Sequence, residues 1–244
     1  MRRLKAIIAS SHHELKSHPL FEALASAPSR EPIATMARAL VWWPMVFQDV
    51  LRLNLDRLRG SRFERFAEFH QHEDAGHDRW YLEDLGTLGL EQPGLEELFG
   101  RSFQPVRETC YALVAEVLRD QSGAQRVALL LALEPTGHVF FERISAAVER
   151  VCPDLQLRYF GRSHLTVEKD HDLFAESTNV ELERIVLTDI ERARSEEMVG
   201  RIFQSFHGLF SYLAETMKAG NPATSYVRDL APKMGTAVRN ASGA

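Results

Sequence analysis

Apolar residues at spacings of three and four run through most of this chain, and this periodicity constrains the fold more than any other feature. Such spacing places apolar side chains on one face of an α-helix, whereas the alternation typical of β-strands is scarce. Glycine and proline fall mostly between the periodic stretches, where they end helices. The pattern predicts an all-α protein, with helices over about 2–15, 18–26, 34–58, 62–87, 93–99, 103–121, 124–150, 154–176 and 179–218.

The predicted helices are expected to form one domain. A chain of 244 residues, 45% of them hydrophobic, is long enough to bury a substantial core without disulfides or metals as staples. We find neither an internal repeat nor a linker between two periodic halves. We therefore predict a single bundle of about seven to nine helices over residues 1–218. Residues 219–244 lose the periodicity and are predicted to form a loosely ordered C-terminal tail.

Composition argues against several classes of function. Lys and Arg number 29 against 34 Asp and Glu, and no basic block stands out, so nucleic-acid binding has little support. No apolar stretch approaches the length of a membrane span, and the apolar run that follows the N-terminal arginines is too short for a signal peptide. The two cysteines, Cys110 and Cys152, are too few for a disulfide framework or a thiolate zinc site. We expect a cytoplasmic protein without a membrane partner.

One predicted helix carries three potential metal ligands on the same face. His164, Glu168 and His171 lie at positions i, i+4 and i+7. At about 100° per residue, the side chains of Glu168 and His171 project within about 40° of the direction of His164. Burying two imidazoles and a carboxylate there without partners would cost several kcal/mol. A metal ion would bind all three.

A second predicted helix repeats this combination of residue types. Glu73 and His77 are four residues apart, and His70 precedes Glu73 by three, so His70 is a reserve ligand. Asp74 and Asp78 are expected to point away from this face and to serve as partners of the imidazole N–H groups. The alternative interpretation is a solvated polar face, because the stretch is rich in charge.

Glu134 interrupts the apolar run LLLALEPTGHVFF. A carboxylate in such surroundings is rarely left without a partner. That partner is either a metal ion, which we favour, or an arginine such as Arg126 or Arg143. His138 follows Glu134 by four residues and is a second reserve ligand.

Three imidazoles and three carboxylates together suit iron, or manganese, better than a structural zinc ion, because no thiolate is among them. The predicted metal ligands are Glu73, His77, Glu134, His164, Glu168 and His171. Six ligands exceed what one catalytic ion with open positions requires, so two ions fit the set. A ferritin-like bundle needs Glu-x-x-His on each of two helices, and only Glu168 to His171 has that spacing.

The order of these motifs resembles the haem-oxygenase-like di-iron oxidases and oxygenases, over about residues 15–215. In chain order the ligands of that family match Glu73, His77, Glu134, His164, Glu168 and His171. The sequence departs from the family at Glu168, where an Asp is usual. It also has His70, and no carboxylate, seven residues before His77, where the spacing of the ligand pair varies within the family.

This resemblance implies a haem-oxygenase-like bundle that holds two Fe²⁺ ions and uses dioxygen as co-substrate. The implied activity is hydroxylation, N-oxygenation or oxidative C–C cleavage of a small organic substrate. A metal-free, thiaminase-like hydrolase of the same fold and a non-catalytic binding protein are the alternatives. Four aromatic residues are interpreted as walls of the substrate pocket: Trp43, Phe47, Phe140 and Tyr159. A homodimer is compatible with a bundle of this size.

Overall fold

The computed structural model describes residues 1–170 and 181–220, except for the side chains of residues 167–170. Every regular element in this part of the chain is helical, which confirms the all-α prediction. The elements are α1 (Arg2–Leu15), α2 (Pro19–Ser26), α3 (Arg30–Ala39), α4 (Trp42–Leu58), α5 (Glu64–Glu73), α6 (His77–Thr87), α7 (Leu95–Phe99), the 3₁₀-helix η1 (Arg101–Phe103), α8 (Gln104–Leu118), α9 (Gly123–Val151), α10 (Arg162–Asp170) and α12 (Asp189–Ala219). None of the described helices has the length and apolar character needed to cross a lipid bilayer.

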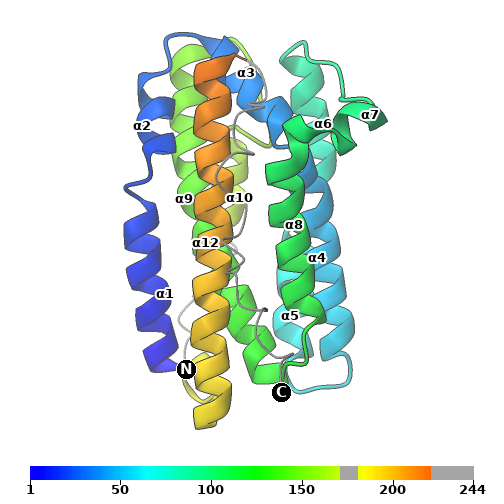
Figure 1. Ribbon diagram of the computed structural model, residues 1–244, viewed down its shortest axis with the longest axis vertical. Coiled ribbons are helices and arrows are strands. Elements are labelled where there is room, and N and C mark those ends of the chain that lie inside the picture. The colour runs from blue at the N-terminus through cyan, green and yellow to red at the C-terminus, as the bar shows by residue number, and fades with distance from the viewer. Residues whose placement is uncertain (171–180, 221–244) are drawn as a thin grey trace, which may run out of the picture.

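The longer helices run roughly parallel or antiparallel to the long axis of the molecule (Figure 1). Helix α12, drawn yellow to orange, lies between α1 and α8 and packs against both, as well as against α2, α3 and α9. Helix α4 packs against α5, α6, α8 and α9, and α10 packs against α9. Helices α4, α5, α6, α9 and α10 are therefore brought together around one region of the bundle.

Helix α9 is deeply buried in the bundle. Residues 127–133 are each at most 2% exposed, so this segment is surrounded on all sides and not only along one stripe. Its start is fixed by a capping box, in which Ser122 and Gln125 satisfy each other's backbone N–H groups. The ligand candidate Glu134 directly follows this apolar segment.

The chain divides into more helices than the periodicity predicts. The described residues contain eleven α-helices, so the expectation of seven to nine is wrong. The segment 34–58 is split, and α4 begins just before Pro44, which lacks the N–H needed inside a continuous helix. The segment 62–87 is split at Gly76, whose φ of 91° lies in the left-handed region. Both breaks fall next to the region where α4, α5, α6, α9 and α10 meet.

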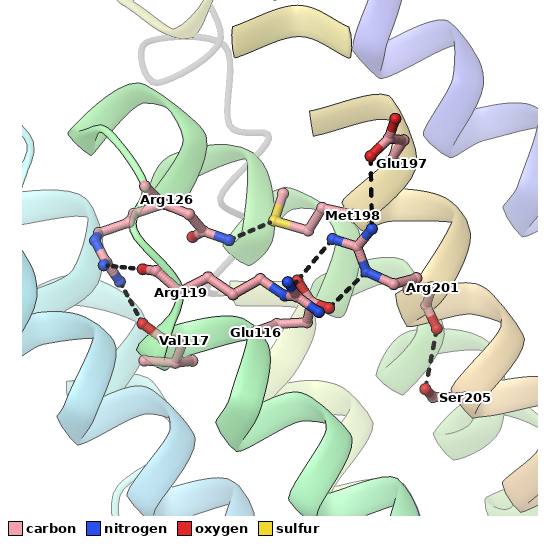
Figure 2. Close-up of polar contacts among 9 residues, drawn as sticks. Glu116, Val117, Arg119, Arg126, Glu197, Met198, Arg201 and Ser205 are labelled. Carbon is pink, nitrogen blue, oxygen red and sulfur yellow. Dashed lines mark hydrogen bonds and ion pairs between the residues drawn. The ribbon is translucent and has the colours of Figure 1, made fainter. Parts of the chain in front are cut away.

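A buried carboxylate joins α8 to α12 (Figure 2). The side chain of Glu116 is 6% exposed and accepts hydrogen bonds from Arg201 Nε at 2.6 Å and Nη2 at 3.0 Å. Arg119 Nε lies 3.1 Å from the same carboxylate. Arg126 of α9 donates to two carbonyls at the C-terminal end of α8, which would otherwise have no helical partner. These polar contacts fix the relative positions of three long helices.

Candidate functional site

A pocket of about 60 Å³ lies where α4, α5, α6, α9 and α10 meet. Its polar lining consists of His70, Glu73, Asp74, His77, Glu134 and His164. Its remaining lining is mostly apolar or aromatic: Trp43, Pro44, Phe47, Gln48, Phe69, Leu133, Gly137, Phe141 and Tyr159. Residues that are more than 90 positions apart in the chain thus share one small volume.

His70 links two carboxylates at this pocket. Its ring is buried, and Nε2 lies 3.1 Å from Oδ2 of Asp74 and 3.3 Å from Oε2 of Glu134. Nδ1 is also buried and has no hydrogen-bond partner among the described residues. The sequence left Glu134 with a choice between a metal ion and an arginine. The structure places it beside His70, and Arg126 instead bonds to the backbone of α8.

The turn at Gly76 decides how His77 enters the pocket. Glu73 ends α5 and His77 begins α6, so these residues do not lie on one continuous helix face as predicted. Asp74 lies in the turn between them, and its Oδ1 is 3.0 Å from His77 Nδ1. His77 Nε2 is buried, with no hydrogen-bond partner in the described part of the chain. Asp74 therefore does serve the imidazoles, as predicted, but it faces the pocket instead of pointing away from it.

His164 is fully buried at the start of α10 and lies opposite His77. The two ring centroids are 4.2 Å apart, and the ring of Phe141 lies 3.8 Å from that of His164. His164 Nδ1 is 2.7 Å from the backbone carbonyl oxygen of Tyr159. A carbonyl only accepts hydrogen bonds, so Nδ1 carries the proton, and the lone pair of the neutral ring is on Nε2.

The surroundings of His70 and His164 shift the pKa values of these two histidines in opposite directions. Burial by itself would lower the pKa of His70, but the hydrogen bond to Asp74 and the charge of Glu134 raise it above its usual value. Burial would raise the pKa of Asp74, yet the hydrogen bonds with His70 and His77 hold it well below its usual range. Burial and the neighbouring His77 lower the pKa of His164 to about 3. The pKa of His70 is thus shifted upwards and that of His164 downwards.

Two predicted ligands lie outside the part of the chain on which this site is built. The side chain of Glu168 and the whole of His171 are not among the described residues. His138, the second reserve ligand, is absent from the pocket lining. Its electrostatic interaction with His12 of α1 contributes to lowering the pKa of His12. Of the four aromatic residues predicted to wall the pocket, Trp43, Phe47 and Tyr159 line it. The fourth, Phe140, does not, and the adjacent residue Phe141 lines the pocket in its place.

The sequence did not single out Asp74 or Phe141 as residues of the pocket. For Asp74 a signal was present, because Gly76 two residues later is a residue that ends helices and turns the chain. For Phe141 no local signal separates it from Phe140, since both lie in one apolar run and only packing decides which ring faces the pocket.

The donor chemistry of the pocket fits a metal such as iron. In both His77 and His164, Nδ1 lies within hydrogen-bond distance of an oxygen atom. Metal-binding histidines use such a contact to orient the ring so that Nε2 faces the ion. Carboxylates of Glu73, Asp74 and Glu134 border the same volume. Within residues 1–166 and 181–220, however, no three His, Cys, Asp or Glu side chains form a ready-made metal site.

Neither the protein-family models nor the curated protein sequences with which the chain was compared give a significant match.

Proposed function

We propose that this chain is a non-haem di-iron oxidase or oxygenase that activates dioxygen to oxidise a small organic substrate. The observation that carries the proposal is the pair of buried imidazoles, His77 and His164, which face each other beside three carboxylates in one pocket. The proposed ligands are Glu73, His77, Glu134, His164, Glu168 and His171. The proposal also rests on the resemblance of these motifs, in their order along the chain, to the haem-oxygenase-like di-iron enzymes.

The charge at the pocket suits a cation. Asp74 and Glu134 both contact His70 Nε2, and the hydrogen bond to Asp74 together with the charge of Glu134 raises the pKa of His70 above its usual value. A metal cation compensates the same negative charge, and ligands must lose protons when a metal binds. Manganese, which prefers the same donor atoms, is the alternative ion.

Two ferrous ions held in this pocket would supply electrons for the reduction of dioxygen, which would serve as the oxidant of an organic substrate. The residues of the protein would orient the imidazole ligands and shield the pocket from water. Asp74 and the Tyr159 carbonyl fix the tautomers of His77 and His164. Trp43 and Phe47, whose rings stack 4.9 Å apart, line the pocket with an apolar surface that excludes water and contacts apolar parts of a substrate.

The structure argues against the thiaminase-like alternative. That chemistry requires a nucleophilic thiolate in a cleft. Cys110 and Cys152 are both buried, and neither lines the pocket. Burial raises the pKa of Cys110 to about 12 and also raises that of Cys152, so neither thiol is activated.

The proposal is tested by loading the metal-free protein with Fe(II) under anaerobic conditions, counting bound iron and then mixing with dioxygen. We expect close to two irons per chain and a dioxygen-dependent change in the optical and Mössbauer spectra. His77→Ala should bind at least one iron fewer. His72→Ala is the matched control, because His72 is an exposed histidine of the neighbouring helix α5.

Two results would contradict the proposal. One is a wild-type protein that binds no more iron than His77→Ala. The other is bound iron that dioxygen does not oxidise, which would favour a non-catalytic binding protein.

A further inference from the structure

Asp84 is a buried carboxylate of α6 that the proposed ligand set does not use. It is 1% exposed, yet its three hydrogen bonds all come from the backbone of one short segment. Oδ1 accepts from Arg158 N at 2.7 Å, and Oδ2 accepts from Tyr159 N and Phe160 N, both at 2.9 Å. Three consecutive N–H groups bound to one carboxylate form a strong, charge-assisted contact. The carboxylate therefore fixes the segment 158–160 against α6.

The other side of the same backbone segment holds His164. The carbonyl of Tyr159 is 2.7 Å from His164 Nδ1, while the N–H of the same peptide group, that of Phe160, donates to Asp84. A single peptide group thus has a carboxylate at its N–H end and an imidazole at its C=O end. Hydrogen bonds in such a chain polarise one another. The negative charge of Asp84 makes the Tyr159 carbonyl a better acceptor for the imidazole N–H.

The segment has little freedom to find another position. A Cβ atom on Gly161 would overlap the carbonyl oxygen of Leu157, so the backbone passes here in a turn that only glycine allows. Tyr159 and Phe160 are buried, and their rings pack edge-to-face against Tyr81 of α6. A shift of this segment would therefore move the carbonyl on which the His164 tautomer depends.

We propose that Asp84 is a positioning residue, which fixes the tautomer and ring orientation of His164 through the Tyr159–Phe160 peptide group. Helix α6 begins with His77, so Asp84 also connects the helix of one imidazole to the segment that orients the other. The effect on His164 itself does not depend on a metal. Its consequence for metal binding rests on the proposed di-iron function.

A neighbouring contact provides a matched control. Glu83 precedes Asp84 and bonds to the side chain of Arg158 at 3.1 Å, with both side chains more than half exposed. The Glu83 carboxylate thus places a negative charge beside the segment 158–160 and contacts the side chain of Arg158, not the backbone of that segment. Glu83→Gln therefore removes a carboxylate from α6 and leaves the peptide contact with His164 intact.

The experiment labels histidine with ¹⁵N and records long-range ¹H–¹⁵N correlations on the metal-free protein at neutral pH. The wild-type protein and Glu83→Gln should show His164 protonated at Nδ1. Asp84→Asn keeps one acceptor oxygen but replaces the other with an NH₂ group that cannot accept a hydrogen bond, and it removes the negative charge, so it should shift His164 towards the Nε2-protonated form. Affinity for Co(II), used as a probe ion, should fall by about 10–100-fold in Asp84→Asn and stay unchanged in Glu83→Gln.

The two proposals fail in different ways. A folded Asp84→Asn protein with the wild-type tautomer and ring environment would overturn the positioning role, whether or not the protein binds metal. A wild-type protein that binds no metal, but in which Asp84→Asn changes the tautomer, would overturn only the di-iron function. If Asp84→Asn does not fold, the wild-type spectrum decides, because an Nε2-protonated His164 contradicts the proposal and an Nδ1-protonated one supports it.

Discussion

Lowering the pH is expected to destabilise the metal-free protein through His164. Burial and the neighbouring His77 lower the pKa of this residue from 6.5 to about 3 in the folded chain. In the unfolded chain the imidazole keeps its ordinary pKa, so below pH 6.5 the unfolded state binds a proton that the folded state does not. The stability that depends on His164 is therefore fully present above pH 6.5 and is lost as the pH falls towards 3.

The expected magnitude follows from the size of this window. Each pH unit between the two pKa values changes the free energy of unfolding by about 1.4 kcal/mol. A fall from pH 6.5 to about 4.5 should therefore cost about 3 kcal/mol. The raised pKa of His70 changes the free energy of unfolding only above pH 6.5. The lowered pKa of Asp74 changes it only below pH 3.8. Neither group therefore dominates the pH dependence of the free energy of unfolding between these two limits.

The assay is urea unfolding of the metal-free wild-type protein and His164→Gln between pH 7 and about pH 4.5. The wild-type protein should lose about 3 kcal/mol more than the variant, because glutamine does not titrate. The pKa values of His12 and His18 are also lowered by burial, but these residues are common to both proteins and cancel. His13→Gln, which removes an exposed imidazole of α1, is the control. Stability curves of wild type and His164→Gln that stay parallel within about 0.5 kcal/mol would refute the reasoning.

Two further predictions concern the contact between Glu116 and Arg201 and the turn at Gly76. Arg201→Leu should cost about 1–3 kcal/mol in urea unfolding, because it strips the buried carboxylate of Glu116 of its bidentate partner. The double variant with Glu116→Leu should recover most of that loss, and strictly additive effects would contradict this account. Gly76→Ala should destabilise the protein by about 1–2 kcal/mol, because alanine is strained at positive φ. Its control Gly86→Ala lies in an exposed turn of α6 and should stabilise by up to about 1 kcal/mol; thermal unfolding that ranks the two variants the other way would contradict the role of the turn.

Much of the helical architecture was predictable because helix formation leaves a local periodic signal. The run of apolar residues in 124–150 predicted α9 almost to its ends. The breaks at Pro44 and Gly76 were harder to place. Each lies inside a stretch whose apolar spacing continues on both sides, and a single glycine or proline is tolerated in many helices. Only the backbone of the folded chain shows that Gly76 adopts a left-handed conformation.

The candidate site was predictable as a set of residue types and less so as a geometry. His77, Glu134 and His164 were identified from spacing and apolar flanks, and the structure gathers them at one pocket. The partners of these residues were not identifiable, since an ion pair such as that between His70 and Glu134 joins residues 64 positions apart in the chain. No local pattern encodes which faces of two helices will meet.

The amino-acid sequence by itself determined that this protein is all-helical and that histidines and carboxylates are concentrated in three of its helical stretches. Both properties are local, because they depend on side-chain spacing along a helix of fixed pitch. Only the tertiary structure decided that Asp74 faces the pocket, that His77 begins a new helix and that Asp84 reaches His164 through a peptide group. These arrangements depend on how the helices pack around α9, where close packing of apolar side chains leaves each polar group few partners to choose from.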